Sequence, residues 1–572
     1  MKSDPLLSEL NSQQQEAVKT TDGAILIIAG PGSGKTRVIT HKIAYLIQKG
    51  VNPETILALT FTDKAASEML DRVNELATTY SDLLITTFHS FCKGLIQENI
   101  LDLRLNADLK IIDDTAQLVW FIKNIDSFGL SHIKVGYQPV TLVDEIRKTI
   151  SKFKDEFISP ERLEKYISKT KSQELSDVEA ERLFALRDIL KAYKAYEAYK
   201  EKSNAIDFGD MLTKIYELLK TKPLILKKYQ NKFKYILVDE FQDTNFIQLQ
   251  IVRLLAGEHN NITIVGDDDQ SIYRFRGAYL TNIAKFREFY PKRKEIFVEQ
   301  NYRCSKKILS VSNKLIANKP DRVTKKIFTE NGEGNPVTVT ECKNEEDQAA
   351  YILKEINKLG ADNDYRDIAI LTRRKKDAQP IMNLLQKHRI PFVFVSNSDF
   401  FREPIIKDIL AYIRTAADPV DADVEVTRIL QRDAFAIKPA EISKFTRYAY
   451  YNKISIFEAF EKLNKIDVDQ SKFLYVYGKI NELIKLKTKL RLSEIVYKIL
   501  FELDFYKHEV SLKNERNIAL LNQFYKFTGD YYNLFGNDEI TDFVDYIQYA
   551  SNFDFAEEYD ATNNAVQIMT IH

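Results

Sequence analysis

The sequence predicts an α/β protein with two parallel sheets, each interrupted by a mainly helical insertion. Short apolar runs without polar alternation recur early in the chain, as in strands that are buried on both faces of a parallel sheet. Helix-like stretches separate several of these runs, which is typical of a βαβ fold. A second series begins near residue 286, and long charged helical stretches interrupt both series.

The first series defines the first domain. Its expected strands are Ala24–Ala29, Thr55–Leu59, Leu83–Thr87, Tyr235–Val238 and Ile262–Val265. Residues 111–204 contain no comparable run, and the stretch 181–200 carries an apolar stripe at helical spacing. We therefore assign residues 1–110 and 205–285 to the first domain and 111–204 to a helical insertion.

The second series defines a second domain over residues 286–399 and 560–572. Its expected strands are Glu295–Glu299, Val337–Thr340, Ile368–Thr372, Phe392–Val395 and Ala565–Ile571. Residues 400–559 between the last two strands are charged and helical in pattern, so we expect a second helical insertion there.

Composition narrows the class of protein. The chain has 572 residues, enough for several domains, and its 82 basic and 82 acidic residues give a formal charge of zero. A surface that binds nucleic acid would therefore have to be a local basic patch on a chain without net charge. None of Cys92, Cys304 and Cys342 belongs to a CxxC pair, so neither a zinc site nor a cluster is indicated. With no apolar segment long enough to span a bilayer, we expect a cytoplasmic protein without a membrane partner.

A glycine-rich loop follows the first expected strand and indicates a phosphate site. Its glycines let backbone N–H groups surround phosphate oxygens at the N-terminus of the next helix. In this pattern Lys35 reaches the β- and γ-phosphates of ATP, and Thr36 ligates Mg²⁺. The loop residues are Ala29, Gly30, Pro31, Gly32, Ser33, Gly34, Lys35 and Thr36.

Two further strands end in polar residues that complete such a site. The run YILVDEFQDT (235–244) delivers Asp239 for the Mg²⁺ shell and Glu240 for the base that orients the attacking water. The run ITIVGDDDQ (262–270) ends at Gln270, which would bond a γ-phosphate or the water. The alternatives without a function are an exposed acidic turn for residues 235–244 and a polar loop for residues 262–270. The glycine-rich loop in the same domain favours the functional interpretation of both segments.

Taken together, these segments resemble the UvrD/Rep/PcrA group of superfamily 1 DNA helicases. LNSQQQEAV (10–18) resembles the group's glutamine motif, and LALTFTDKAASEM (57–69) and TTFHSFC (86–92) resemble its DNA-contacting segments. VEQNYRCSKKIL (298–309) resembles the motif that opens the second motor domain, FFREPIIKDILAYIR (400–414) the approach to its second insert, and AVQIMTIH (565–572) the start of its fifth motif. The resemblance covers nearly the whole chain, with all motifs in the group's order.

The resemblance implies two RecA-like P-loop motor domains with ATP between them. Tyr302 takes the adenine-stacking position, and Arg303 supplies an arginine finger from the second domain. Other expected ATP contacts are Gln14, Arg37 and Arg276. The expected DNA contacts are Phe61, Thr62, His89, Tyr273, Phe275 and His572.

Three departures from the group's pattern stand out. Asp63 replaces the usual Asn, and Phe275 replaces the usual Trp while still offering a ring face for a base. The sequence stops at His572, inside the fifth motif. We expect a partial sequence, with a sixth motif and a further γ-phosphate arginine beyond it.

Three functional hypotheses follow. The first is an ATP-driven 3′→5′ DNA helicase acting in repair or replication on single strands and single-strand/duplex junctions. The second is the motor of a helicase–nuclease, working with repair or nuclease partners. The third is a piece that binds ATP or DNA with little turnover. The pathway and the oligomeric state stay open.

Overall fold

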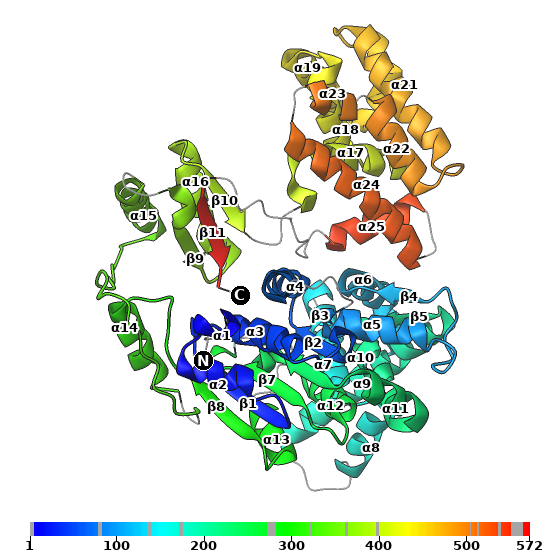
Figure 1. Cartoon of the computed structure of the whole chain (residues 1–572). Helices are drawn as coiled ribbons and strands as arrows, with labels where there is room; N and C mark the ends of the chain where they lie inside the picture. The colour runs from blue at the N-terminus through cyan, green and yellow to red at the C-terminus, as the bar shows by residue number, and fades with distance from the viewer. Residues whose placement is uncertain are drawn as a thin grey trace. The chain divides into compact units, whose positions relative to one another are not determined.

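The structure, a computed structural model, describes residues 5–77, 83–133, 139–170, 176–271, 282–319, 322–360, 364–395, 400–503, 505–511, 514–535, 539–550 and 564–571. The chain divides into two compact units (Figure 1). The first comprises Met1–Ile112 and Phe121–Glu341, and the second comprises Asp113–Trp120 and Cys342–Ile571. Each unit has its own parallel sheet, so the predicted α/β class is confirmed.

The sheet of the first unit has the strand order β3-β2-β6-β7-β1-β8, and all of its strand pairs are parallel. The order places β7 between β6 and β1, so the carboxyl ends of these three strands meet at one edge. The strands are β1 (Ala24–Ala29), β2 (Ile56–Thr60), β3 (Leu84–Thr87), β6 (Tyr235–Val238), β7 (Ile262–Gly266) and β8 (Lys294–Val298).

Strand β1 shows why these apolar runs lack polar alternation. Successive side chains of a strand point to opposite faces of the sheet. Leu26 and Ile28 pack into the core on one face, whereas Ile25 and Ile27 pack into the core on the other. Because both faces are covered by helices, every position in the strand favours an apolar residue.

Helices flank this sheet on both faces. Helices α3 and α4 contribute to one core, and α5, α10 and α12 contribute to the other. The helices of this part are α1 (Pro5–Ser8), α2 (Ser12–Lys19), α3 (Lys35–Gln48), α4 (Asp63–Ala77), α5 (Phe88–Glu98), α10 (Phe208–Thr221), α11 (Pro223–Lys232), α12 (Phe246–Ala256), α13 (Asn282–Phe289) and α14 (Lys306–Ile316).

Residues 111–204, for which the sequence predicted a helical insertion, are mainly helical in the described part of the chain. The ends of this segment form two short parallel strands, β4 (Lys110–Ile112) and β5 (Ala205–Asp207). The predicted stripe lies on α9, where Tyr193 and Tyr196 are buried. The helices are α6 (Asp114–Asn124), α7 (Pro139–Asp155), α8 (Pro160–Thr170) and α9 (Asp177–Lys202).

The second unit combines a small sheet with a helical bundle. The sheet has the parallel order β10-β11-β9, formed by β9 (Ala369–Thr372), β10 (Phe392–Val395) and β11 (Val566–Thr570). Helices α15 (Glu345–Leu359) and α16 (Lys375–Lys387) share its core. The bundle helices are α17 (Pro404–Ala417), α18 (Asp423–Leu430), α19 (Pro439–Asn452), α20 (Ile456–Ala459), α21 (Gln470–Leu486), α22 (Leu492–Glu502), α23 (Phe505–Ser511), α24 (Glu515–Phe535) and α25 (Ile540–Ala550).

Two expected strands of the second domain differ in the structure. Strand β8, predicted as Glu295–Glu299, pairs with β1 in the first sheet, because its buried face completes the core beside that strand. Residues 337–340 form no strand, and Val339 is 93% exposed, so this alternating segment has no strand partner in the described structure. In the described part of the chain, no helix has both the length and the apolar character needed to cross a bilayer.

Candidate active site

The glycine-rich loop connects β1 to α3 at the central edge of the first sheet. Gly32 has a φ of +64° and Gly34 a φ of +84°, so the loop uses the left-handed conformation that glycine adopts most easily. The buried Ser33 closes the turn, because its hydroxyl donates to the carbonyl of Gly30 over 2.7 Å. The chain then enters α3 with Lys35 as its first residue.

Lys35 meets the two predicted catalytic groups directly. Its Nζ lies 2.7 Å from Oε2 of Glu240 and 3.0 Å from Oε1 of Gln270. The lysine side chain is only 9% exposed, whereas Glu240 is 35% exposed. Lys35 is thus brought to two groups that lie more than 200 residues further along the chain, because β1, β7 and β6 are neighbours in the sheet.

The two predicted magnesium ligands also lie together. Asp239 is buried at the end of β6 and accepts a hydrogen bond from the side chain of Thr36. Burial and the neighbouring charge of Glu240 raise the pKa of the Asp239 carboxyl to about 7. A bound cation would reverse this effect by favouring the carboxylate. A hydroxyl beside a carboxylate is a set of hard oxygen ligands that fits Mg²⁺.

Glu240 adopts an uncommon backbone conformation, with a φ of +46°. Non-glycine residues seldom occupy this region, and such strain clusters at functional sites. The side chain of Gln242 fixes the turn, because its Nε2 donates to Oε2 of Glu240 over 2.8 Å and its Oε1 accepts the N–H of Asp267 over 3.0 Å. Gln242 therefore links the ends of β6 and β7, a role that the sequence pattern did not reveal.

The glutamine motif packs against the glycine-rich loop. Gln14 is buried, and its Nε2 donates to the carbonyl of Ser33 over 2.9 Å while its Oε1 accepts the N–H of Asn11. Arg37 projects from α3 and pairs with Glu9 at 2.6 Å. Both side chains therefore lie near the predicted nucleotide, and their contacts with it stay predictions.

The segment with Tyr302 and Arg303 packs on the same loop. The N–H of Tyr302 donates to the carbonyl of Gly32 over 2.9 Å, and Nδ2 of Asn301 donates to the carbonyl of Pro31 over 2.6 Å. We expected Arg303 to come from the second motor domain, but residues up to Glu341 belong to the unit that holds the loop. This placement follows from β8, which brings the chain back to β1. Tyr302 is exposed and Arg303 lies at the surface, both beside the nucleotide loop.

Three of the predicted DNA contacts lie at the carboxyl ends of β2 and β3. Phe61 and Thr62 follow β2, and His89 lies in the first turn of α5, with its ring 5.7 Å from that of Phe208. Ser90 of α5 donates to Asp63 over 3.4 Å, which joins the two segments. The remaining predicted residues, Tyr273, Phe275, Arg276 and His572, lie outside the described residues.

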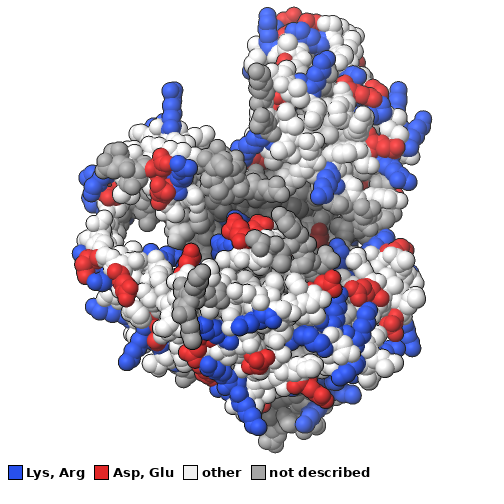
Figure 2. Space-filling view, in the orientation of Figure 1, with Lys and Arg blue, Asp and Glu red and all other residues white. Residues whose placement is uncertain are grey.

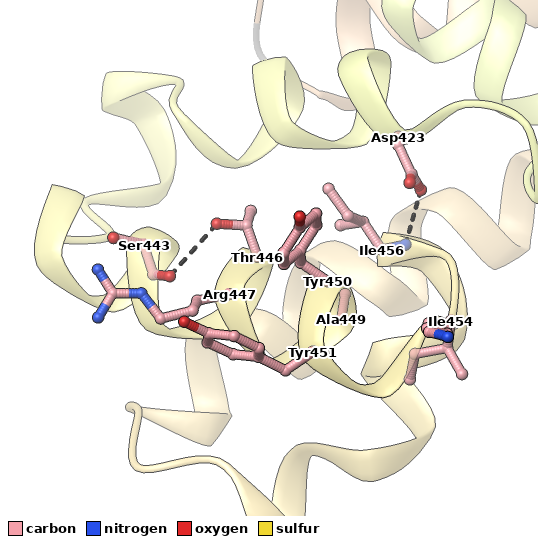
Figure 3. A pocket seen from close by; sticks show the side chains of 10 residues that line it. Asp423, Ser443, Thr446, Arg447, Ala449, Tyr450, Tyr451, Ile454 and Ile456 are labelled. Carbon is pink, nitrogen blue, oxygen red and sulfur yellow. Dashed lines mark hydrogen bonds between the residues drawn. The ribbon is translucent and has the colours of Figure 1, made fainter.

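Surface charge gives no simple indication of the DNA path. Basic and acidic side chains are interspersed on the face shown in Figure 2, in agreement with the formal charge of zero. A cavity of about 750 Å³ opens in the helical bundle of the second unit beside Arg447 and Tyr451 (Figure 3). The one carboxylate in its lining, Asp423, already accepts the N–H of Ile456 over 2.7 Å. The described lining residues of the cavity thus show no ion pair comparable to the one between Lys35 and Glu240 beside the glycine-rich loop.

The fold and the site define a P-loop nucleotide-binding protein with a second α/β unit. The UvrD/REP helicase N-terminal domain model matches residues 10–291, and the UvrD-like helicase C-terminal domain model matches residues 296–572. The chain belongs to the UvrD-like helicase family. It is 35% identical over 583 aligned positions to the ATP-dependent DNA helicase PcrA of Staphylococcus epidermidis, covering 99% of this chain and 76% of that protein. The PcrA of Staphylococcus aureus is 34% identical over the same shares.

Proposed function

We propose that the protein is an Mg²⁺-dependent ATPase that moves 3′→5′ along single-stranded DNA and unwinds the duplex at single-strand/duplex junctions. The observation that carries this proposal is the convergence of Lys35, Glu240 and Gln270 at the ends of three neighbouring strands. Family membership supports DNA as the polymer on which the motor acts. Three unpaired cysteines support a cytoplasmic site of action.

The chemical step follows from the roles that the side chains can take. Thr36 and Asp239 would hold Mg²⁺, which would neutralise phosphate charge when bound. Lys35 would leave Glu240 for the β- and γ-phosphates. The freed Glu240 would then orient a water molecule for in-line attack, while Gln270 hydrogen-bonds the γ-phosphate or that water. Arg303 would stabilise the charge that develops on the transferred group.

Movement on DNA requires that the nucleotide state reach the DNA contacts. Ser271 follows Gln270 directly, and its hydroxyl donates to the carbonyl of Gln242 over 3.4 Å. At the other end of the 272–281 segment, Asn282 donates to the carbonyl of Thr244 over 2.6 Å. Both ends of the segment with Tyr273, Phe275 and Arg276 are therefore anchored to the turn that follows Glu240. Stacking of bases on Tyr273 and Phe275 would respond to that turn.

A strand-displacement assay tests this proposal. The substrates are two duplexes of the same sequence, one with a 3′ single-stranded tail and one with a 5′ tail, incubated with ATP and Mg²⁺. We expect displacement on the 3′-tailed substrate alone, and none with Lys35→Ala. The matched control is Lys49→Ala, which removes an exposed lysine just after the same helix. Equal displacement on 5′ tails would contradict the polarity, and displacement without ATP would contradict the mechanism.

A further inference from the structure

A buried cluster of ion pairs lies beside the ATP site and involves residues without an assigned role. Lys325 reaches the three consecutive carboxylates at the end of β7. Its Nζ is 2.9 Å from both Asp268 and Asp269 and also contacts Asp267. The lysine side chain is 2% exposed and that of Asp267 is fully buried. Because the three acids already have Lys325 and the flanking Arg322 and Lys319 as partners, the cluster is not a vacant cation site.

The cluster fixes the orientation of Gln270. Nε2 of Gln270 donates to Oδ2 of Asp267 over 2.7 Å, and the other carboxylate oxygen of Asp267 accepts from Lys325. An amide that donates to Asp267 must turn its carbonyl oxygen the other way. That oxygen accepts from Lys35 over 3.0 Å, on the side where the phosphates of ATP would lie. Lys325 therefore acts on the amide through one intervening carboxylate.

The same lysine lies next to the segment that carries Arg303. The N–H of the neighbouring Lys326 donates to Oε1 of Glu299 over 2.6 Å. Phe328 bridges to Gln300, and its carbonyl accepts the N–H of Asn301 over 2.7 Å. Oδ1 of Asn301 in turn accepts the N–H of Arg303 over 2.9 Å. Residues 322–328 thus contact the end of β7 on one side and the Arg303 turn on the other.

We propose that Lys325 is a positioning residue for ATP hydrolysis. Lys325 holds the orientation of Gln270 through Asp267 and fixes the position of Gln270 relative to the Arg303 turn. The proposal rests on the proposed function, since it assigns Gln270 and Arg303 to the hydrolytic step. A displacement of about 1 Å at such a group lowers a rate about 10- to 100-fold. A residue that only stabilised the fold would lower the melting temperature without a specific effect on kcat.

The test compares Lys325→Met with Lys325→Arg, which keeps the charge, and with Lys326→Met, which changes the exposed neighbour. ATP hydrolysis is followed with saturating poly(dT), and kcat and KM for ATP are determined separately. We expect Lys325→Met to lower kcat about 10- to 100-fold with little change in KM. Lys325→Arg should recover most of the loss, and Lys326→Met should behave as the parent protein.

A double-variant cycle decides whether Lys325 acts through Gln270. We expect Gln270→Ala with Lys325→Met to be no slower than Gln270→Ala alone. If the double variant loses kcat by the product of the two single-variant losses, the proposal is overturned. An unchanged kcat in Lys325→Met would overturn it as well. If Lys325→Met does not fold, Asp267→Asn replaces it in the same cycle, with the same expected and contradicting results. A parent protein without DNA-stimulated hydrolysis would instead refute the proposed function.

Discussion

Nζ of Lys35 and Oε2 of Glu240 form an ion pair over 2.7 Å at the centre of the candidate site. In this ion pair Glu240 takes the place that a phosphate would take beside Lys35, and Lys35 takes the place that a water molecule would take beside Glu240. The lysine must release the carboxylate to reach the phosphates, and the carboxylate must then accept a hydrogen bond from water. Under the proposed function, ATP binding and activation of the base would be coupled through this one contact.

Glu240→Gln tests the role of the carboxylate as the base. Glutamine keeps the size of the side chain and its contact with Gln242 but accepts a proton poorly. We expect kcat for ATP hydrolysis to fall by about 10²- to 10⁴-fold while ATP still binds. Steady-state hydrolysis and the fluorescence of a labelled ATP analogue give the two quantities. Glu258→Gln, at an exposed position, is the control, and hydrolysis at the parent rate in Glu240→Gln would exclude this base.

Gly32→Ala tests the contact between the nucleotide loop and the Arg303 segment. A Cβ at Gly32 would lie 2.8 Å from Cβ of Arg303 and 2.8 Å from Nδ2 of Asn301. Gly50 also has a positive φ, +86°, and a Cβ added at Gly50 would have no atom within 4 Å. Gly50→Ala is therefore a matched control for backbone strain. Both changes should cost roughly 1–2 kcal/mol of stability. We expect only Gly32→Ala to weaken ATP binding, and equal binding in the two variants would contradict the contact.

Asp155→Asn tests a buried carboxyl that joins the first insertion to the motor. Its Oδ1 accepts from Nδ2 of Asn245 over 2.7 Å, two residues after the Phe241–Asp243 turn. Burial raises the pKa of the Asp155 carboxyl to about 7, against the lowering effect of that hydrogen bond. The folded state therefore binds more protons than the unfolded state between about pH 4 and pH 7. Stability contributed by this group is present below that window and is lost as the pH rises through it.

Asparagine keeps the acceptor and removes the titration. We expect the free energy of unfolding of Asp155→Asn to match that of the parent near pH 4 and to exceed it by about 1–3 kcal/mol at pH 8. Urea unfolding at several pH values measures the difference. A gap that does not grow with pH would show that the carboxyl is already ionised in the folded protein at neutral pH.

Asp188→Ala tests the anchor of the 131–133 loop on α9. Oδ2 of this buried carboxylate accepts three backbone N–H groups, from Ser131, His132 and Ile133, at 2.6–3.0 Å. These bonds hold the pKa of Asp188 well below its usual range, although burial opposes them. Loss of the acceptor should cost about 1–3 kcal/mol and speed amide exchange in the loop. Lys191→Met keeps the three N–H bonds of Asp188 and removes the ion pair of Lys191 with Asp188 together with its hydrogen bond to the carbonyl of Gly129, so comparable exchange in both variants would contradict the anchor.

Local patterns predicted much of the fold. The bounds of β1, β6 and β10 agree with the predicted runs. In β1 and β6 burial explains the continuous apolar signal, whereas β10 is an edge strand whose residues Phe392–Phe394 are half-buried. The assignment of β8 to the second sheet was wrong, because strand pairing is non-local and the sequence does not show which sheet receives an edge strand. Residues 337–340 alternate like a strand, yet alternation does not supply a strand partner.

The sequence predicted which candidate site residues lie together where they belong to motifs, and it did not predict the contacts that depend on packing. Lys35, Glu240 and Gln270 lie together as expected, because their strands end at one edge of the sheet. Gln242 and Lys325 were missed, because a glutamine in a turn and a lysine in a basic segment look solvated until the fold buries them. The run of three aspartates was the one available signal, since such a run in the interior requires cationic partners.

The most direct test of the proposed function is the rate of ATP hydrolysis as a function of single-stranded DNA concentration, in the presence of Mg²⁺. We expect a rate that rises to a plateau with poly(dT) in the parent protein and stays at background in Lys35→Ala. A rate in the parent protein that does not change with DNA, or hydrolysis that survives in Lys35→Ala, would contradict it.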